Sequence, residues 1–154
     1  MIALKLPLVV PFSLAFVVHT ALAQVVVSDA WIRGTVAGQR TTGAFMRLSS
    51  ATDQTLVAVS SPAAVSVEIH EMTMEQGVMK MRAIDKLAIH AGQTVDLKSG
   101  GYHLMLQDLR ATLKAGDTVP MSLTWQDGSG KKMTQDVAVL VKLLTATSDG
   151  AHKH

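Results

Sequence analysis

The feature that most constrains the fold of this chain is a succession of short runs of alternating or β-branched residues, each followed by a turn that usually contains glycine. Such runs are typical of strands, and no amphipathic helix pattern of three turns or more is present. We expect strands over residues 25–33, 43–49, 55–60, 65–74, 78–84, 94–98, 102–107, 118–126 and 132–143. Many short strands at this spacing predict an all-β fold, either a sandwich or a barrel.

The first 23 residues have the pattern of an export signal. Lys5 supplies one positive charge, an apolar run follows, and Ala21-Leu22-Ala23 matches the small-x-small pattern after which signal peptidase cuts. The alternative is a membrane anchor, but Pro7 and Pro11 interrupt the run, which falls short of the roughly 20 apolar residues that a spanning helix needs. We therefore expect an exported protein, cleaved after Ala23.

The length and composition of the chain limit the number of domains and exclude several classes of function. We expect a single β domain over residues 24–145 and a flexible tail over 146–154, since a chain of this length can bury one independent core. The 14 basic and 12 acidic residues form no basic stripe, which argues against nucleic-acid binding. There is no cysteine, so disulfides and thiol chemistry are excluded, as is a blue-copper electron carrier, whose site needs a cysteine thiolate.

Aromatic residues are scarce in the expected domain, and Trp31, Phe45 and Trp125 lie within strand patterns. Large aromatic side chains bury much apolar area and usually anchor a core. We therefore expect Trp31, Phe45 and Trp125 to be core residues.

Residues 70–81, HEMTMEQGVMKM, concentrate methionine and predict a β-hairpin. If Gln76-Gly77 forms a two-residue turn, Met74 faces Met79 and Met72 faces Met81. Strand alternation then places one set of residues on a single face, namely His70, Met72, Met74, Met79 and Met81. Two interpretations compete: methionines that fill a core, or a soft-metal site. A histidine within the stripe favours the metal site, because burying an unpartnered histidine is costly.

A second segment carries the same chemistry. His103 and Met105 are two residues apart and share one face of an expected strand. With the hairpin they offer imidazoles and thioethers, and we expect no carboxylate on the same faces. Thioether sulfur is soft and uncharged, which favours Cu(I) over zinc, calcium or magnesium.

The spacing of these residues resembles that of the periplasmic copper chaperones of the PCuAC family. In that pattern His70 and Met81 are separated by ten residues, and twenty-one more precede His103-x-Met105. Other segments resemble the family too: Asp29-Ala30-Trp31, Gly43-Ala44-Phe45-Met46, Gly77-Val78-Met79-Lys80-Met81-Arg82 and Gly100-Gly101-Tyr102-His103-Leu104-Met105-Leu106. The resemblance implies a cupredoxin-like Greek-key β-barrel with His70, Met81, His103 and Met105 as Cu(I) ligands.

The same resemblance implies a role. It predicts a non-enzymatic periplasmic metallochaperone that delivers Cu(I) to copper-enzyme assembly, notably the copper A centre on subunit II of cytochrome c oxidase, alongside Sco-type chaperones. Three alternatives stay open: a general periplasmic copper storage or resistance protein, a copper-dependent oxidoreductase, and a structural β domain whose methionines only pack.

Two groups of residues fall outside the four-ligand pattern. Met72, Met74 and Met79 form either a hydrophobic collar, which we favour, or a reserve of further ligands. Family relatives often carry a longer histidine- and methionine-rich tail, whereas this chain ends in His152-Lys153-His154. Those two histidines are either a weak Cu(II) site or part of an unstructured stub, and the missing methionines favour the stub.

Overall fold

The computed structural model describes residues 24–143, and every regular element in that range is a β-strand. The strands are β1 (Val26–Arg33), β2 (Thr42–Ser49), β3 (Gln54–Ser60), β4 (Ala64–Glu75), β5 (Val78–Ile84), β6 (Leu87–Ile89), β7 (Thr94–Leu97), β8 (His103–Leu109), β9 (Thr118–Asp127) and β10 (Lys132–Lys142). The expected export signal and the tail histidines, His152 and His154, lie outside the described residues. Within the described part, no helix is long and apolar enough to cross a membrane.

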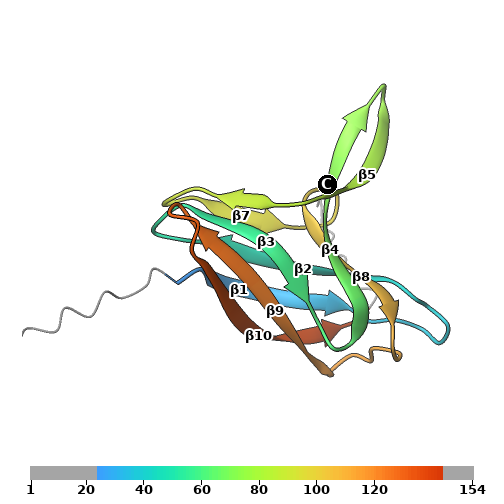
Figure 1. Ribbon diagram of the computed structural model, residues 1–154. Coiled ribbons are helices and arrows are strands. Elements are labelled where there is room, and N and C mark those ends of the chain that lie inside the picture. The colour runs from blue at the N-terminus through green and yellow to red at the C-terminus, as the bar shows by residue number, and fades with distance from the viewer. Residues whose placement is uncertain (1–23, 144–154) are drawn as a thin grey trace, which may run out of the picture.

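The all-β prediction is confirmed, and the strands close into a barrel (Figure 1). The order β4-β8-β2-β1-β10-β9-β3 is closed by pairing of β3 with β4 at Val59 and Val67. β1 and β10 run parallel, and the other pairs are antiparallel. Closure satisfies the edges that an open sheet would leave unpaired. β5, β6 and β7 add to the margins of this barrel.

Alternation along the strands fills the barrel interior, as the period of two requires. Ile32, Leu56, Leu104 and Trp125 are among the side chains that are fully buried there. Trp125 also donates a hydrogen bond from Nε1 to Oε1 of Gln135 at 3.0 Å, so its polar atom is satisfied. The expectation that Trp125 is a core anchor is therefore confirmed.

The same expectation is wrong for Trp31 and holds only in part for Phe45. Ile32 points into the barrel, so its neighbour Trp31 points outwards and is only half-buried. Trp31 stacks on Phe45 with ring centroids 4.7 Å apart, and the Lys142 ammonium lies 5.8 Å from the indole ring. Phe45 is buried, but by this outer cluster rather than by the barrel core.

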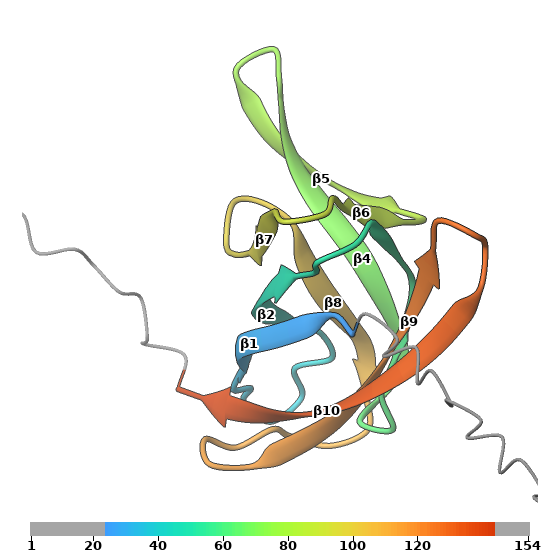
Figure 2. The same cartoon turned by 90° about the vertical axis from the view of Figure 1, so that its left-hand side faces the viewer.

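The β4–β5 hairpin projects from one end of the barrel (Figures 1 and 2). β4 pairs with β8 only as far as His70, and its remaining residues pair with β5 alone. The register is the one expected from the sequence: Met74 faces Met79, and Met72 faces Met81. Gln76 and Gly77 both have positive φ, 52° and 78°, as the two central residues of a type I′ hairpin turn require.

Strand β6 is the one described strand that the sequence did not predict. It has three residues and pairs with β3, and its Leu87 and Ile89 are buried around an exposed Ala88. A run this short is below the four to eight residues over which alternation can be recognised. The other strands lie within about two residues of their expected bounds.

Candidate metal centre

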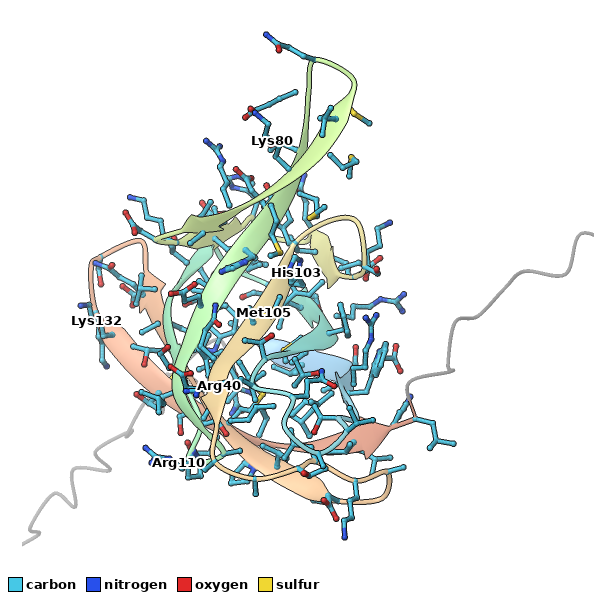
Figure 3. All side chains as sticks on the ribbon, turned by 90° about the vertical axis from the view of Figure 1, so that its right-hand side faces the viewer. Arg40, Lys80, His103, Met105, Arg110 and Lys132 are labelled. Atoms are coloured by element: carbon cyan, nitrogen blue, oxygen red, sulfur yellow. The ribbon has the colours of Figure 1, made fainter. Side chains whose placement is uncertain are left out.

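The residues that the sequence singles out converge where the hairpin leaves the barrel. His70 on β4 lies directly opposite His103 on β8, and their ring centroids are 5.6 Å apart. Their neighbours Ile69 and Leu104 point into the core, so both imidazoles lie on the outer face. Figure 3 shows His103 on β8 close to the base of the hairpin, with Met105 farther along the same strand.

His103 has a defined tautomer. Its Nδ1 lies 3.1 Å from the carbonyl oxygen of Gly101, which can only accept, so the ring proton of the neutral imidazole belongs on Nδ1. The other nitrogen, Nε2, then carries a lone pair and lies 3.2 Å from Sδ of Met81. Two electron-pair donors therefore face each other. Their separation is close to the roughly 3.5 Å between nitrogen and sulfur ligands of a tetrahedral ion, taking bond lengths of about 2.0 and 2.3 Å.

His70 is held in the complementary way. Its Nε2 lies 2.7 Å from Oε2 of Glu68, and a carboxylate accepts, so Nε2 carries the proton. The remaining nitrogen, Nδ1, is buried and has no hydrogen-bond partner. Buried polar atoms without a partner are costly and call for an explanation. A lone pair kept free for a cation would provide one.

A cavity of about 210 Å³ opens beside these side chains. Met81, His103 and Met105 line it, together with Met72, which the sequence pattern does not include. The structure thus brings three of the four expected ligands to one cavity. His70 is not among the lining residues; it lies next to His103 and is 7% exposed.

The floor and wall of this cavity depend on the outer aromatic cluster. Gly43 lies opposite Met105, and a Cβ at Gly43 would come within 2.8 Å of Cζ of Phe45. The Phe45 ring therefore occupies space that any other residue at position 43 would take. Phe45 in turn lies 6.4 Å from the His103 ring and 5.5 Å from the guanidinium of Arg33, the one charged residue in the cavity lining.

Glu68 is the residue that sequence reasoning missed. The expectation of no carboxylate on the ligand faces is wrong, because Glu68 lies two residues before His70 on the same face. Hydrogen bonding to His70 lowers the pKa of Glu68, and a contact from Gln107 at 3.4 Å lowers it further. The i, i−2 spacing along β4 could have identified Glu68. Among residues 24–143 there is no group of three or more His, Cys, Asp or Glu that could hold a metal ion.

This arrangement can hold a soft cation. The cavity brings the His103 imidazole together with thioether sulfurs, the His70 imidazole lies beside His103, and no carboxylate lines the cavity. Such neutral donors suit Cu(I) and do not meet the preferences of calcium or magnesium for oxygen. Each imidazole is oriented through its other nitrogen, as metal-binding histidines usually are.

Comparison with known proteins identifies the family of this chain. The model of the family described as "Putative lipoprotein LpqE-like" matches residues 25–141. The chain belongs to this LpqE-like family. A putative lipoprotein of Leifsonia xyli, Lxx21020, is 38% identical over 119 residues, covering 75% of this chain and 68% of the relative. An uncharacterised protein of Rickettsia prowazekii, RP573, is 36% identical over 84 residues, covering 54% of this chain but only 46% of the relative.

Solved structures similar to this LpqE-like protein include copper(I)-loaded DR1885 and PCuAC domains. Copper(I)-loaded DR1885 of Deinococcus radiodurans is 32% identical, with a TM-score of 0.58, and the match covers 79% of this chain and 81% of that one. The apo PCuAC domain of PmoF2 has a TM-score of 0.61 at 20% identity, covering 79% and 92%, and supports the fold alone. The expectation of a cupredoxin-like β-barrel of the PCuAC type is confirmed.

Proposed function

We propose that this protein is an exported, non-enzymatic Cu(I) metallochaperone that holds one ion between His70, Met81, His103 and Met105. The observation that carries the proposal is the pair of imidazoles whose unprotonated nitrogens are left without a hydrogen-bond donor, one facing Met81 sulfur and one buried. The similarity to copper(I)-loaded DR1885 supports copper as the cargo. The lipoprotein descriptions of the family and of the Leifsonia relative support export, here to the periplasm.

The geometry also suits release. Met81 is 49% exposed, so an incoming ligand can reach one side of the ion while the buried histidines keep hold of the other. We propose that the recipient is the copper A centre on subunit II of cytochrome c oxidase, with Sco-type chaperones as partners. A storage or resistance protein would share the binding site but would have no preferred recipient.

Direct measurement of copper binding tests the proposal. We expect one tight equivalent of Cu(I) in competition with bicinchoninate, and two nitrogen and two sulfur neighbours by X-ray absorption. Affinity should fall between pH 7 and 5, because protons compete with copper for imidazole nitrogen. Absence of tight Cu(I) binding by the folded protein, or a copper shell without sulfur, would refute the site.

Substitution of the ligands separates binding from folding. Met81→Leu and His103→Ala should each leave a folded barrel with weaker Cu(I) affinity. Loss of a residue that only hydrogen-bonds to a ligand typically lowers metal affinity roughly 10–100-fold, and loss of a ligand itself should cost at least as much. Met133→Leu is the matched control, since Met133 lies on β10, opposite Trp125, and is not part of the cavity lining. Transfer from the loaded protein to an apo copper A domain, faster than to a bulk chelator of equal affinity, would favour delivery over storage.

A further inference from the structure

The outermost methionines of the hairpin are exposed although they lie in regular β-structure. Met74 and Met79, here called the outer pair, have exposed fractions of 63% and 45%. Methionine usually serves to fill irregular gaps in a core, but this pair lies between β4 and β5. The β4–β5 hairpin extends beyond the barrel (Figure 1). Core packing therefore does not account for them.

The hairpin does not need the face that carries Met74 and Met79 in order to stay folded. Its turn is a type I′ turn, which matches the strand twist without strain at glycine. The opposite face carries ion pairs between Glu75 and Lys80, at 2.9 Å, and between Glu71 and Arg82. Charged side chains are thus confined to one face, and the other face presents thioethers.

The outer pair is also well placed for chemistry. Met74 and Met79 are direct cross-strand partners, so their Cβ atoms are about 5 Å apart. Two flexible thioethers at that spacing can close on one soft cation, and neither needs to lose a proton. A site with two solvent-exposed ligands binds more weakly than one with four ligands that are partly buried.

The outer pair is continuous with the inner site. The next cross-strand pair on the same face towards the barrel is Met72 and Met81, and both line the cavity that His103 also lines. The two pairs are separated by two residues along each strand, which is about 7 Å. An ion at the outer pair therefore lies one short step from Met81 sulfur.

We propose that Met74 and Met79 form a second, weaker Cu(I) site at the hairpin tip, through which copper reaches the inner site. This inference rests on the proposed function, because the outer pair has a role in copper uptake only if the inner site takes the ion. It replaces the expectation of a hydrophobic collar for these two residues, while Met72 remains part of the cavity wall.

The test follows methionine methyl groups. In the protein labelled with 13C at the methionine methyls, the first equivalent of Cu(I) should shift the resonances of Met81 and Met105. Further equivalents should shift those of Met74 and Met79. In a variant with the inner site removed, His103→Ala/Met105→Leu, the outer pair should respond to the first copper added.

A kinetic measurement tests the path. Met74→Leu/Met79→Leu keeps size and apolarity but removes both sulfurs, so the affinity of the inner site should stay at its wild-type value. Uptake of copper from a Cu(I)–bicinchoninate complex should slow by about tenfold or more at micromolar copper, because an ion held next to its destination has an effective concentration on the order of millimolar. Met133→Leu should take up copper at the wild-type rate.

The outcomes separate the two proposals. If Met81 and Met105 respond but the outer pair stays unshifted under excess copper, the outer site is refuted. If the double leucine variant loads at the wild-type rate, copper does not reach the inner site through the outer pair. Either result leaves the chaperone proposal standing. A tip that serves only to dock a protein would give the same unshifted resonances. If no methionine responds to Cu(I), the proposed function itself fails.

Discussion

The barrel and the hairpin are built from the same kind of strand but are stabilised in different ways. In the barrel, alternate side chains enter a closed interior where Leu56, Leu104 and Trp125 are fully buried. In the hairpin beyond His70, two strands pair with each other and most side chains are exposed. The difference shows that burial of apolar area stabilises one region, whereas turn geometry and ion pairs on one face order the other.

This contrast explains where the candidate site lies. His70 and His103 are on the barrel, held by buried neighbours, while Met81 is on the hairpin and half exposed. The barrel supplies the two oriented nitrogens and the Met105 sulfur, and the more accessible hairpin supplies the Met81 sulfur. Such a division suits a site that must both retain and release an ion.

The largest difference between the two regions should appear in stability. Trp125→Ala empties a fully buried position and should lower the free energy of unfolding by about 3–5 kcal/mol, measured by urea denaturation. Met74→Ala, at an exposed hairpin position, should stay within about 0.5 kcal/mol of wild type. Equal losses for the two variants would mean that the hairpin is part of the cooperative core.

A smaller effect should separate the two faces of β4. Glu68→Ala removes the partner of His70 Nε2 and should lower Cu(I) affinity by roughly 10–100-fold, as loss of such an outer partner commonly does. Glu71→Ala, on the opposite face of the same strand, is the control and should leave affinity close to wild type. In the apo protein, the ring 15N shifts of His70 should report a proton on Nε2, and in Glu68→Ala this preference should be lost.

A still smaller effect should be confined to the hairpin turn. Gly77→Ala forces a side chain into positive φ, which costs about 1–2 kcal/mol. Backbone amides of β5 should then exchange faster with solvent while those of β9 and β10 keep their protection, by hydrogen-exchange mass spectrometry. Gly128→Ala is the matched control, because Gly128 is not at positive φ and a Cβ there meets nothing within 4 Å. Exchange that rose throughout the barrel would contradict this separation.

The smallest expected effect concerns the turn between β9 and β10. Hydrogen bonds from Ser129, and then from the Lys131 backbone amide, lower the pKa of Asp127 below its ordinary 3.8. Because the folded state binds this proton less readily, the stabilisation is present above pH 3.8 and is lost as pH falls through the lower, folded pKa. The difference in unfolding free energy between wild type and Asp127→Asn should therefore shrink as pH falls below 3.8, and a constant difference would exclude this cause.

Much of the fold could be predicted because the alternation of side chains along a strand depends only on residues that are close together in the sequence. The register of the hairpin followed from Gln76-Gly77 alone, since a two-residue turn determines which residues face each other. The outward position of Trp31 could not be predicted, because period two shows that Trp31 and Ile32 point to opposite sides but not which side is the core. The three residues of β6 were too few to show any period.

The candidate site was partly predictable for the same reason. The residue types at 70, 81, 103 and 105 and their faces came from spacing, and the resemblance to PCuAC proteins joined them into one set. That Gly101 and Glu68 orient the two imidazoles required the structure, since the Gly101 contact is made by a backbone carbonyl and Glu68 was not recognised as a partner.

By itself, the sequence determined that this chain forms β-strands, where its main hairpin turns, and which residues carry soft donor atoms. These properties depend on local stereochemistry and on side-chain chemistry. Only the tertiary structure decided that β4 pairs with β8 so that His70 lies opposite His103, and that Met81 sulfur reaches His103 nitrogen. Those contacts join residues that are distant along the chain, and closure of the barrel around its core is what brings them together.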